Sequence, residues 1–154
     1  MLQKIKQALW GDLTGEELKR FGMLALTLLF IIGTYWLMRP LKDGLFVSIV
    51  GKNYLPYAKM LSFCFILPLV LVYAKLVDLV EKQKLFYILC TAYAILFLVI
   101  TYFISHPTIG LENTVASKNR ILGWVIYLAI ESFGSLLPSL FWSFVASSTD
   151  TKSA

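Results

Sequence analysis

Four long apolar segments follow one another along the chain and are separated by short polar links. The first is interrupted by the sequence Arg39-Pro40-Leu41-Lys42-Asp43, and the fourth contains a single charged residue, Glu131. About 20 residues of α-helix cross a bilayer core about 30 Å thick. The pattern therefore predicts an all-α membrane protein with four transmembrane helices in one transmembrane domain, residues 1–154. The expected helices cover about residues 17–50, 54–76, 85–104 and 121–148.

Composition supports the membrane assignment. Hydrophobic residues make up 58% of the chain, charged residues 15% and aromatic residues another 15%. Soluble domains are about 45–50% apolar and about 25% charged. A water-soluble fold of this size could not bury so much apolar surface, so a soluble enzyme, a disordered protein and a disulfide scaffold are excluded. Cys64 and Cys90 both lie in apolar segments, where a thiol acts as a small hydrophobic side chain.

The positive charges lie mostly in the links, where they indicate orientation. Short helical hairpins place both termini on one side of the membrane. With the N-terminus inside, eight basic residues lie inside and six lie outside. The inner set is Lys4, Lys6, Lys19, Arg20, Lys75, Lys82, Lys84 and Lys152, and the outer set is Arg39, Lys42, Lys52, Lys59, Lys118 and Arg120. We expect both termini to be cytoplasmic, and no basic patch suits a nucleic acid.

The first unusual group of charges is Arg39, Lys42 and Asp43. In a continuous helix these residues are three and four positions apart, so all three can share one face. Pro40 can kink such a helix. If the helix continues to about residue 50, Lys42 lies at membrane depth, where an ionisable side chain needs a partner or a water-filled cavity. The alternative is that the helix ends at Met38 and the three charges belong to a surface loop.

The second unusual charge is Glu131, deep within the fourth apolar segment. Gly134 and Ser135 follow it closely, and small residues allow a neighbouring helix to approach. An exposed loop position does not fit this context. Two interpretations stay open, a structural hydrogen bond or ion pair between helices and a functional carboxylate that lines a cavity.

Other kinds of chemistry lack the residues they need. The sequence contains no phosphate-binding glycine-rich loop before a helix, no metal-ligand spacing of His or Cys, and no nucleophile with a base beside it. The one histidine, His106, stands next to Pro107 at the end of an apolar segment. We therefore expect neither an enzyme nor a bound cofactor or metal.

Several segments together resemble the N-terminal part of the ATP/ADP translocases, the nucleotide transporters of intracellular bacteria and plastids. The most specific is Arg-Pro-Leu-Lys-Asp at residues 39–43, within Tyr-Trp-Leu-Met-Arg-Pro-Leu-Lys-Asp-Gly-Leu. The other resembling segments are Trp10-Gly11 with residues 17–21, residues 73–76, residues 84–87, Glu-Ser-Phe-Gly-Ser at 131–135 and Leu-Phe-Trp-Ser-Phe at 140–144. The resemblance covers nearly the whole chain, but only about the first third of such a transporter.

This resemblance implies a major-facilitator-like bundle of twelve helices in two halves, which exchanges ATP for ADP or imports nucleotides. It also implies a functional lysine at Lys42 and a functional glutamate at Glu131. The chain departs from the family pattern at Phe133, where Trp is frequent, and at residues 145–147, where Val-Ala-Ser replaces Ala-Asn. Which nucleotide is carried, and whether by exchange or net uptake, stays open.

Our hypothesis is a segment of a nucleotide antiporter in a bacterial inner membrane. Lys42, assisted by Arg39, would attract the phosphate, because lysine is a compact charge and arginine can hold two oxygens. Glu131 would balance Lys42 in the empty site or help a gate between the first and fourth helices, and Asp43 is a further candidate for a gating or ion-pair role. Partners would be ATP or ADP, the lipid bilayer and further transporter helices. The alternatives are a small non-transporting subunit or scaffold, and an ion-coupled carrier of another substrate.

Overall fold

The computed structural model describes residues 15–148, and these residues form four long helices. The elements are α2 (Gly15–Ile49), the short 3-10 helix η1 (Lys52–Tyr54), α3 (Leu55–Leu79), α4 (Lys82–Ile104) and α5 (Ile121–Ser148). All four long helices are long and apolar enough to cross a membrane. The all-α transmembrane fold class is therefore confirmed. The Trp10-Gly11 part of the resemblance lies outside the described residues.

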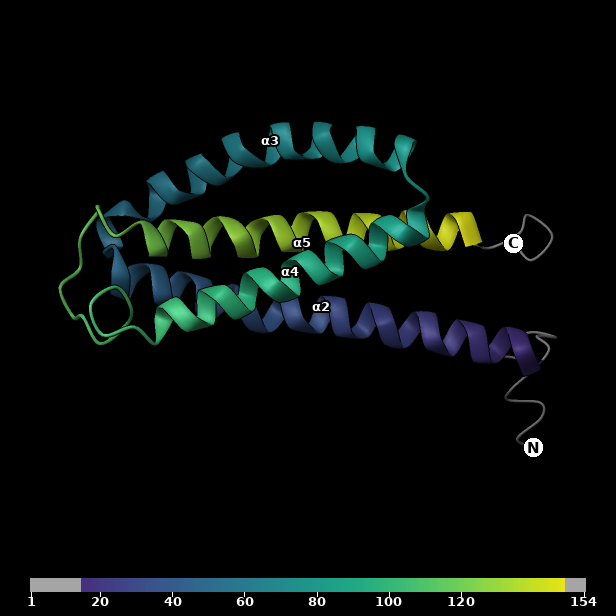
Figure 1. Cartoon of the computed structure of the whole chain (residues 1–154), viewed down its shortest axis with the longest axis horizontal. Coiled ribbons are helices and arrows are strands. Elements are labelled where there is room, and N and C mark those ends of the chain that lie inside the picture. Colours follow the sequence, from purple (N-terminus) through teal and green to yellow (C-terminus); the bar gives the residue numbers. More distant parts are fainter. Residues whose placement is uncertain (1–14, 149–154) are drawn as a thin grey trace.

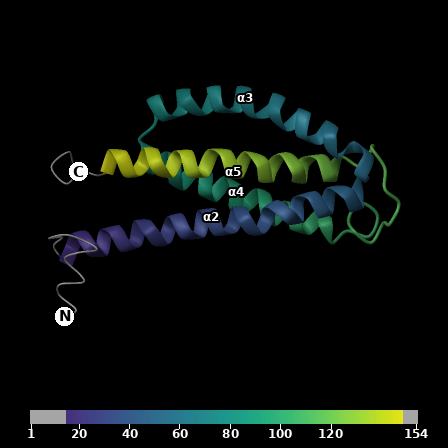
Figure 2. The ribbon, with the colours of Figure 1, turned by 180° about the vertical axis from the view of Figure 1, so that it is seen from behind.

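Successive helices run in opposite directions, as short connections require (Figure 1). The start of α2 and the end of α5 lie at one end of the bundle. The long connection between α4 and α5 lies at the other end, beside the junction of α2 with α3, and the reverse view in Figure 2 shows the same arrangement. We refer to these as the terminal end and the loop end.

Helix α5 is the centre of the packing. Half of the residues in its membrane-spanning stretch are buried, against 6% in the corresponding stretch of each other long helix. Helices α2, α3 and α4 all contact α5, and Figures 1 and 2 both show α5 with α3 on one side and α2 on the other. The outward faces of α2, α3 and α4 are rich in exposed large apolar side chains. Such faces suit contact with lipid or with other transmembrane helices.

Two apolar clusters hold α5 in place. The loop-end cluster joins α2 to α5 through residues that include Phe46, Ile49, Val50, Ile126 and Tyr127. The terminal-end cluster joins α2, α4 and α5 and consists of Ile31, Tyr93, Phe133, Leu136, Leu137 and Phe141. Glycines keep α2 and α5 close, because a Cβ atom at Gly123 would collide with Val50 and one at Gly134 would collide with Tyr35.

Three prolines lie beyond the first turn of a long helix, Pro40 in α2, Pro68 in α3 and Pro138 in α5. Each removes one backbone donor from its helix without ending it. Helix α3, with Pro68 near its middle, is visibly bowed in both views (Figures 1 and 2). Helix α2 continues through Pro40 to Ile49, so Lys42 and Asp43 lie on a transmembrane helix and not on a surface loop.

The connection between α4 and α5 is organised around Arg120. Its guanidinium donates hydrogen bonds to the carbonyl oxygens of four residues in this connection and to that of Ile49 at the end of α2. The four loop acceptors are Ile109, Gly110, Asn113 and Val115. The backbone N–H of Ser117 also donates to the Ile49 carbonyl, at 3.2 Å. One side chain thereby ties the loop to the C-terminal end of α2.

Candidate functional site

Lys42 is a buried charge near the loop end of α2, only 3% exposed. Its Nζ atom donates a hydrogen bond to Glu131 Oε1 on α5 and forms an ion pair with that carboxylate. The two residues are 89 positions apart in the sequence. The structure thus joins the two charges that stand out in the sequence, across the interface between α2 and α5.

Asp43 supplies a second carboxylate to the same ammonium. Its Oδ1 atom lies 3.6 Å from Lys42 Nζ, close enough for an ion pair but too long for a hydrogen bond. This oxygen is buried and accepts no hydrogen bond from the described residues. The site therefore holds one cation and two carboxylates, an arrangement whose local charge is negative while Glu131 and Asp43 are both ionised.

Exposure gives the site a closed side and an open side. The Lys42 side chain is 4% exposed, whereas the Glu131 side chain is 23% and the Asp43 side chain 45% exposed. A solute that approaches from the open side therefore meets the carboxylates before the ammonium. The arrangement can bind an anion only if the anion takes the place of a carboxylate at Lys42.

Arg39 is not brought to this pair. It is exposed on α2, and its Cζ atom lies 5.8 Å from the centre of the Trp36 ring, in a cation–π contact. The three-residue spacing from Lys42 permits a shared face, but helix packing buries Lys42 against α5 and leaves Arg39 outside. Arg39 thus lies one turn of helix away on the exposed surface of α2, where its guanidinium is accessible.

Tyr127 is the site residue that the sequence reasoning missed. Lys42 Nζ lies 4.1 Å from the centre of the Tyr127 ring, so the ammonium faces an aromatic ring as well as a carboxylate. Tyr127 precedes Glu131 by four positions on α5, and this spacing places both on one helix face. The signal in the sequence is therefore an aromatic residue one helical turn before Glu131. This signal becomes specific only once the structure places Lys42 opposite.

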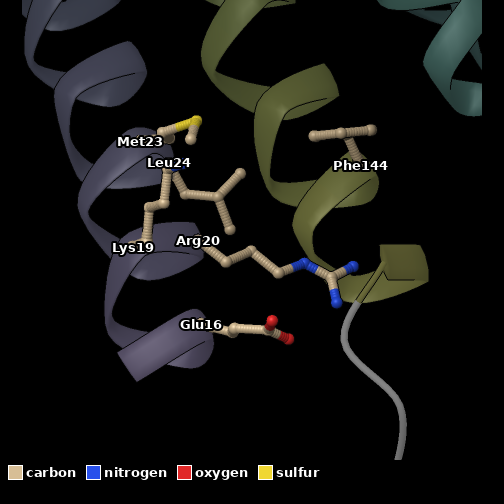
Figure 3. Close-up of a pocket in the computed structure, with 6 residues that line it drawn as sticks. All are labelled: Glu16, Lys19, Arg20, Met23, Leu24 and Phe144. Carbon is tan, nitrogen blue, oxygen red and sulfur yellow. The ribbon is translucent and has the colours of Figure 1, made fainter. Parts of the chain in front are cut away.

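Two surface pockets lie elsewhere. One, of about 460 Å³, is at the terminal end and is lined by Glu16, Lys19, Arg20, Met23, Leu24 and Phe144. Figure 3 shows the Arg20 and Glu16 side chains extending from α2 toward the last turns of α5. At 1.5 Å per residue, Arg20 is about 33 Å along α2 from Lys42. The other pocket, of about 360 Å³, is at the loop end and is lined by Tyr54, Tyr57, Lys118, Asn119 and Trp124.

The fold defines an integral membrane protein in which an ion pair joins two membrane-spanning helices, and charged groups on such helices are typical of transport proteins. Comparison with known families agrees. Residues 1–144 match the family model described as TLC ATP/ADP transporter, and the chain belongs to this family. No solved structure matches the chain significantly.

Curated relatives carry the names of carriers. The chain is 26% identical to ADP,ATP carrier protein 3 of Rickettsia conorii over 99% of its length, and this alignment covers 34% of the relative. It is 30% identical to ADP,ATP carrier protein 1 of Chlamydia pneumoniae over 92% of its length, which covers 31% of that relative. The chain thus spans about a third of the length of the curated relatives it matches.

Proposed function

We propose that the chain forms the N-terminal part of a nucleotide antiporter and that Lys42 binds a phosphate group of ATP or ADP. The observation that carries this proposal is the ion pair between the buried Lys42 and the partly exposed Glu131, which joins two transmembrane helices of a chain in this transporter family. A charge at this depth is costly unless it is paired, and it marks a pathway for a charged solute.

The chemistry of the site suits an exchange of anions. A phosphate oxygen takes the place of Glu131 at the ammonium, so that Lys42 has an anionic partner both before and after binding. The released Glu131 carboxylate is the more exposed of the pair, so it can turn toward water. Arg39, already on the exposed surface, is the residue that can hold two further phosphate oxygens.

The same pair gives a reason why such a carrier would exchange nucleotides and would not change conformation while its site is empty. With no nucleotide bound, the Lys42–Glu131 pair joins α2 to α5. Separating these helices then leaves a buried charge without a partner, which costs several kcal/mol. A bound nucleotide removes this penalty, because its phosphate takes over the ammonium. Asp43, 3.6 Å from Nζ, contributes to the same gate.

We further infer a bacterial inner-membrane location with both termini in the cytoplasm. The excess of basic residues in the links at the terminal end supports this orientation. The start of α2 and the end of α5 lie at that same end (Figure 1). The loop around Arg120 then faces the opposite compartment.

Nucleotide binding by the chain in lipid nanodiscs tests the proposal. We expect retention of radiolabelled ATP by the unaltered chain and a loss of at least about 100-fold in affinity for Lys42→Ala, as expected for a charge-assisted contact that leaves Glu131 unpaired. Lys59→Ala is the matched control, because Lys59 is an exposed lysine on α3. Equal binding by Lys42→Ala and Lys59→Ala would refute the role of Lys42.

A scaffold or subunit without transport activity is the second candidate. It is favoured by the exposed apolar faces of α2, α3 and α4, which could pack against partner helices. In that case the chain would bind no nucleotide in nanodiscs and would be recovered with a partner membrane protein after mild solubilisation.

A further inference from the structure

The Lys42 ammonium has partners of two kinds, the carboxylates of Glu131 and Asp43 and the ring of Tyr127, and in the proposed function, on which this inference rests, only Glu131 is exchanged. Glu131 is an anion that phosphate can replace, whereas the Tyr127 ring carries no net charge and does not compete with phosphate. We propose that Tyr127 is a positioning residue. Its ring holds the Lys42 ammonium in place while the anionic partner of the ammonium changes from Glu131 to the phosphate.

The ring is fixed in the position that this role requires. Tyr127 is 1% exposed. The Phe46 ring packs against it edge-on, with ring centres 5.3 Å apart and planes at 67°. The Trp124 ring also packs edge-on against Phe46, with ring centres 5.0 Å apart. Phe46 follows Lys42 by one helical turn, so α2 supplies both the ammonium and the support for the ring that faces it.

A neutral partner matters most while the ammonium has left Glu131 and has not yet bound the phosphate. A cation–π attraction is strongest for a bare, desolvated ammonium and is weaker when a carboxylate already neutralises the charge. The Tyr127 ring therefore stabilises the state between the two anionic partners more than it stabilises either end state.

A positioning role for Tyr127 has a kinetic signature that a residue important only for packing would not show. Replacing Tyr127 by Leu should slow both the association and the dissociation of ATP by about 5- to 30-fold, the range that corresponds to a desolvated cation–π contact. The dissociation constant should stay within about threefold. Tyr127→Phe keeps the ring face and should stay much closer to the unaltered chain than Tyr127→Leu does.

Two measurements on the chain in lipid nanodiscs test the proposal. In the first, lysines are labelled with carbon-13, and the Lys42 ε-methylene signal is assigned by its loss in Lys42→Arg. A ring directly beneath Nζ shifts this signal upfield of the other lysines. We expect the upfield shift in the unaltered chain and in Tyr127→Phe, and its loss in Tyr127→Leu. A Lys42 signal at the position of the exposed lysines would overturn the proposal without any reference to nucleotide binding.

In the second measurement, rapid mixing with fluorescent ATP gives the two rate constants. Tyr93→Leu is the control, because Tyr93 is a buried tyrosine that packs on Phe133, with ring centres 5.4 Å apart, away from Lys42. Trifluorophenylalanine in place of Tyr127 keeps the shape of the ring but removes its negative face, so it should slow exchange as Leu does even if Leu impairs folding. Unchanged rates in both Tyr127 variants, or equal slowing by Tyr93→Leu, would overturn the inference.

The two proposals fail in different ways. If Lys42→Ala binds ATP as tightly as the unaltered chain, the proposed function of Lys42 is wrong, and the upfield shift of Lys42 still reports the ring contact. If Lys42→Ala abolishes binding but the Tyr127 variants keep their rates, only the positioning role of Tyr127 is wrong.

Discussion

The ion pair between Lys42 and Glu131 gives a stability prediction that involves no nucleotide. Glu131→Gln keeps the size of the side chain but removes its charge, which leaves Asp43 Oδ1, at 3.6 Å, as the remaining carboxylate near the ammonium. Removing one member of a buried pair costs about 3–5 kcal/mol. Because the Glu131 side chain is 23% exposed and Asp43 takes over part of the attraction, we expect the free energy of unfolding to fall by about 2 kcal/mol.

A double-mutant cycle isolates this interaction. Lys42→Met removes the cation and leaves Glu131 without its partner, so it should also destabilise the helix bundle. The double variant, with Lys42→Met and Glu131→Gln, contains no unpaired charge from this pair. It should therefore lose less stability than the sum of the single variants, with a coupling of about 2 kcal/mol. Unfolding is followed by tryptophan fluorescence and circular dichroism as the fraction of dodecyl sulfate in mixed micelles is raised.

The chain contains its own control for the cycle. Glu81 and Lys84 form an ion pair at 3.1 Å, but their side chains are 72% and 70% exposed. An exposed pair of this kind should show a coupling below about 0.5 kcal/mol. Additive effects for Lys42 and Glu131, within the same limit, would show that burial does not strengthen their interaction and would refute the reasoning.

Two other predictions follow from the polar groups of α2 and the loop. Arg120→Lys keeps the charge but loses the planar guanidinium that donates to several loop carbonyls. Residues 105–120 should therefore exchange their backbone hydrogens, and be cleaved by protease, at least about tenfold faster. Unchanged protection of this loop would contradict the prediction. Asp43→Cys should react with a water-soluble maleimide much faster than Leu71→Cys. Leu71 is 69% exposed on the apolar surface of α3, which suits contact with lipid and not with water. Equal labelling of the two cysteines would place Asp43 in lipid.

The fold was largely predictable because helix number follows from the lengths of the apolar segments. The path of α2 was not, since Pro40 and three charges are compatible both with a helix end and with a continuous helix. Packing decides between them. Phe46, Ile49 and Val50, all beyond the charges, are buried against α5, and this apolar contact is gained only if α2 continues through Pro40.

The site was predictable in its charges but not in its contacts. Lys42 and Glu131 each stand out because ionised groups are rare in apolar segments. Their pairing depends on how α2 and α5 pack over a separation of 89 residues, which no local spacing encodes. Tyr127 shows the same limit, because a tyrosine in an apolar helix becomes informative only when a cation lies over its ring. Arg120, counted among the outer charges, is in fact the centre of the loop.

The exposed side of the site indicates what must surround it in the working protein. Arg39 is exposed on α2, and the side chains of Asp43 and Glu131 remain partly open beside it. Lipid cannot cover three ionised groups without a cost of several kcal/mol for each. The apolar faces of α3 and α4 have no such restriction. The surface formed by α2 and α5 around the Lys42–Glu131 pair should therefore face water or protein, which is the environment that the proposed binding of a nucleotide at Lys42 requires.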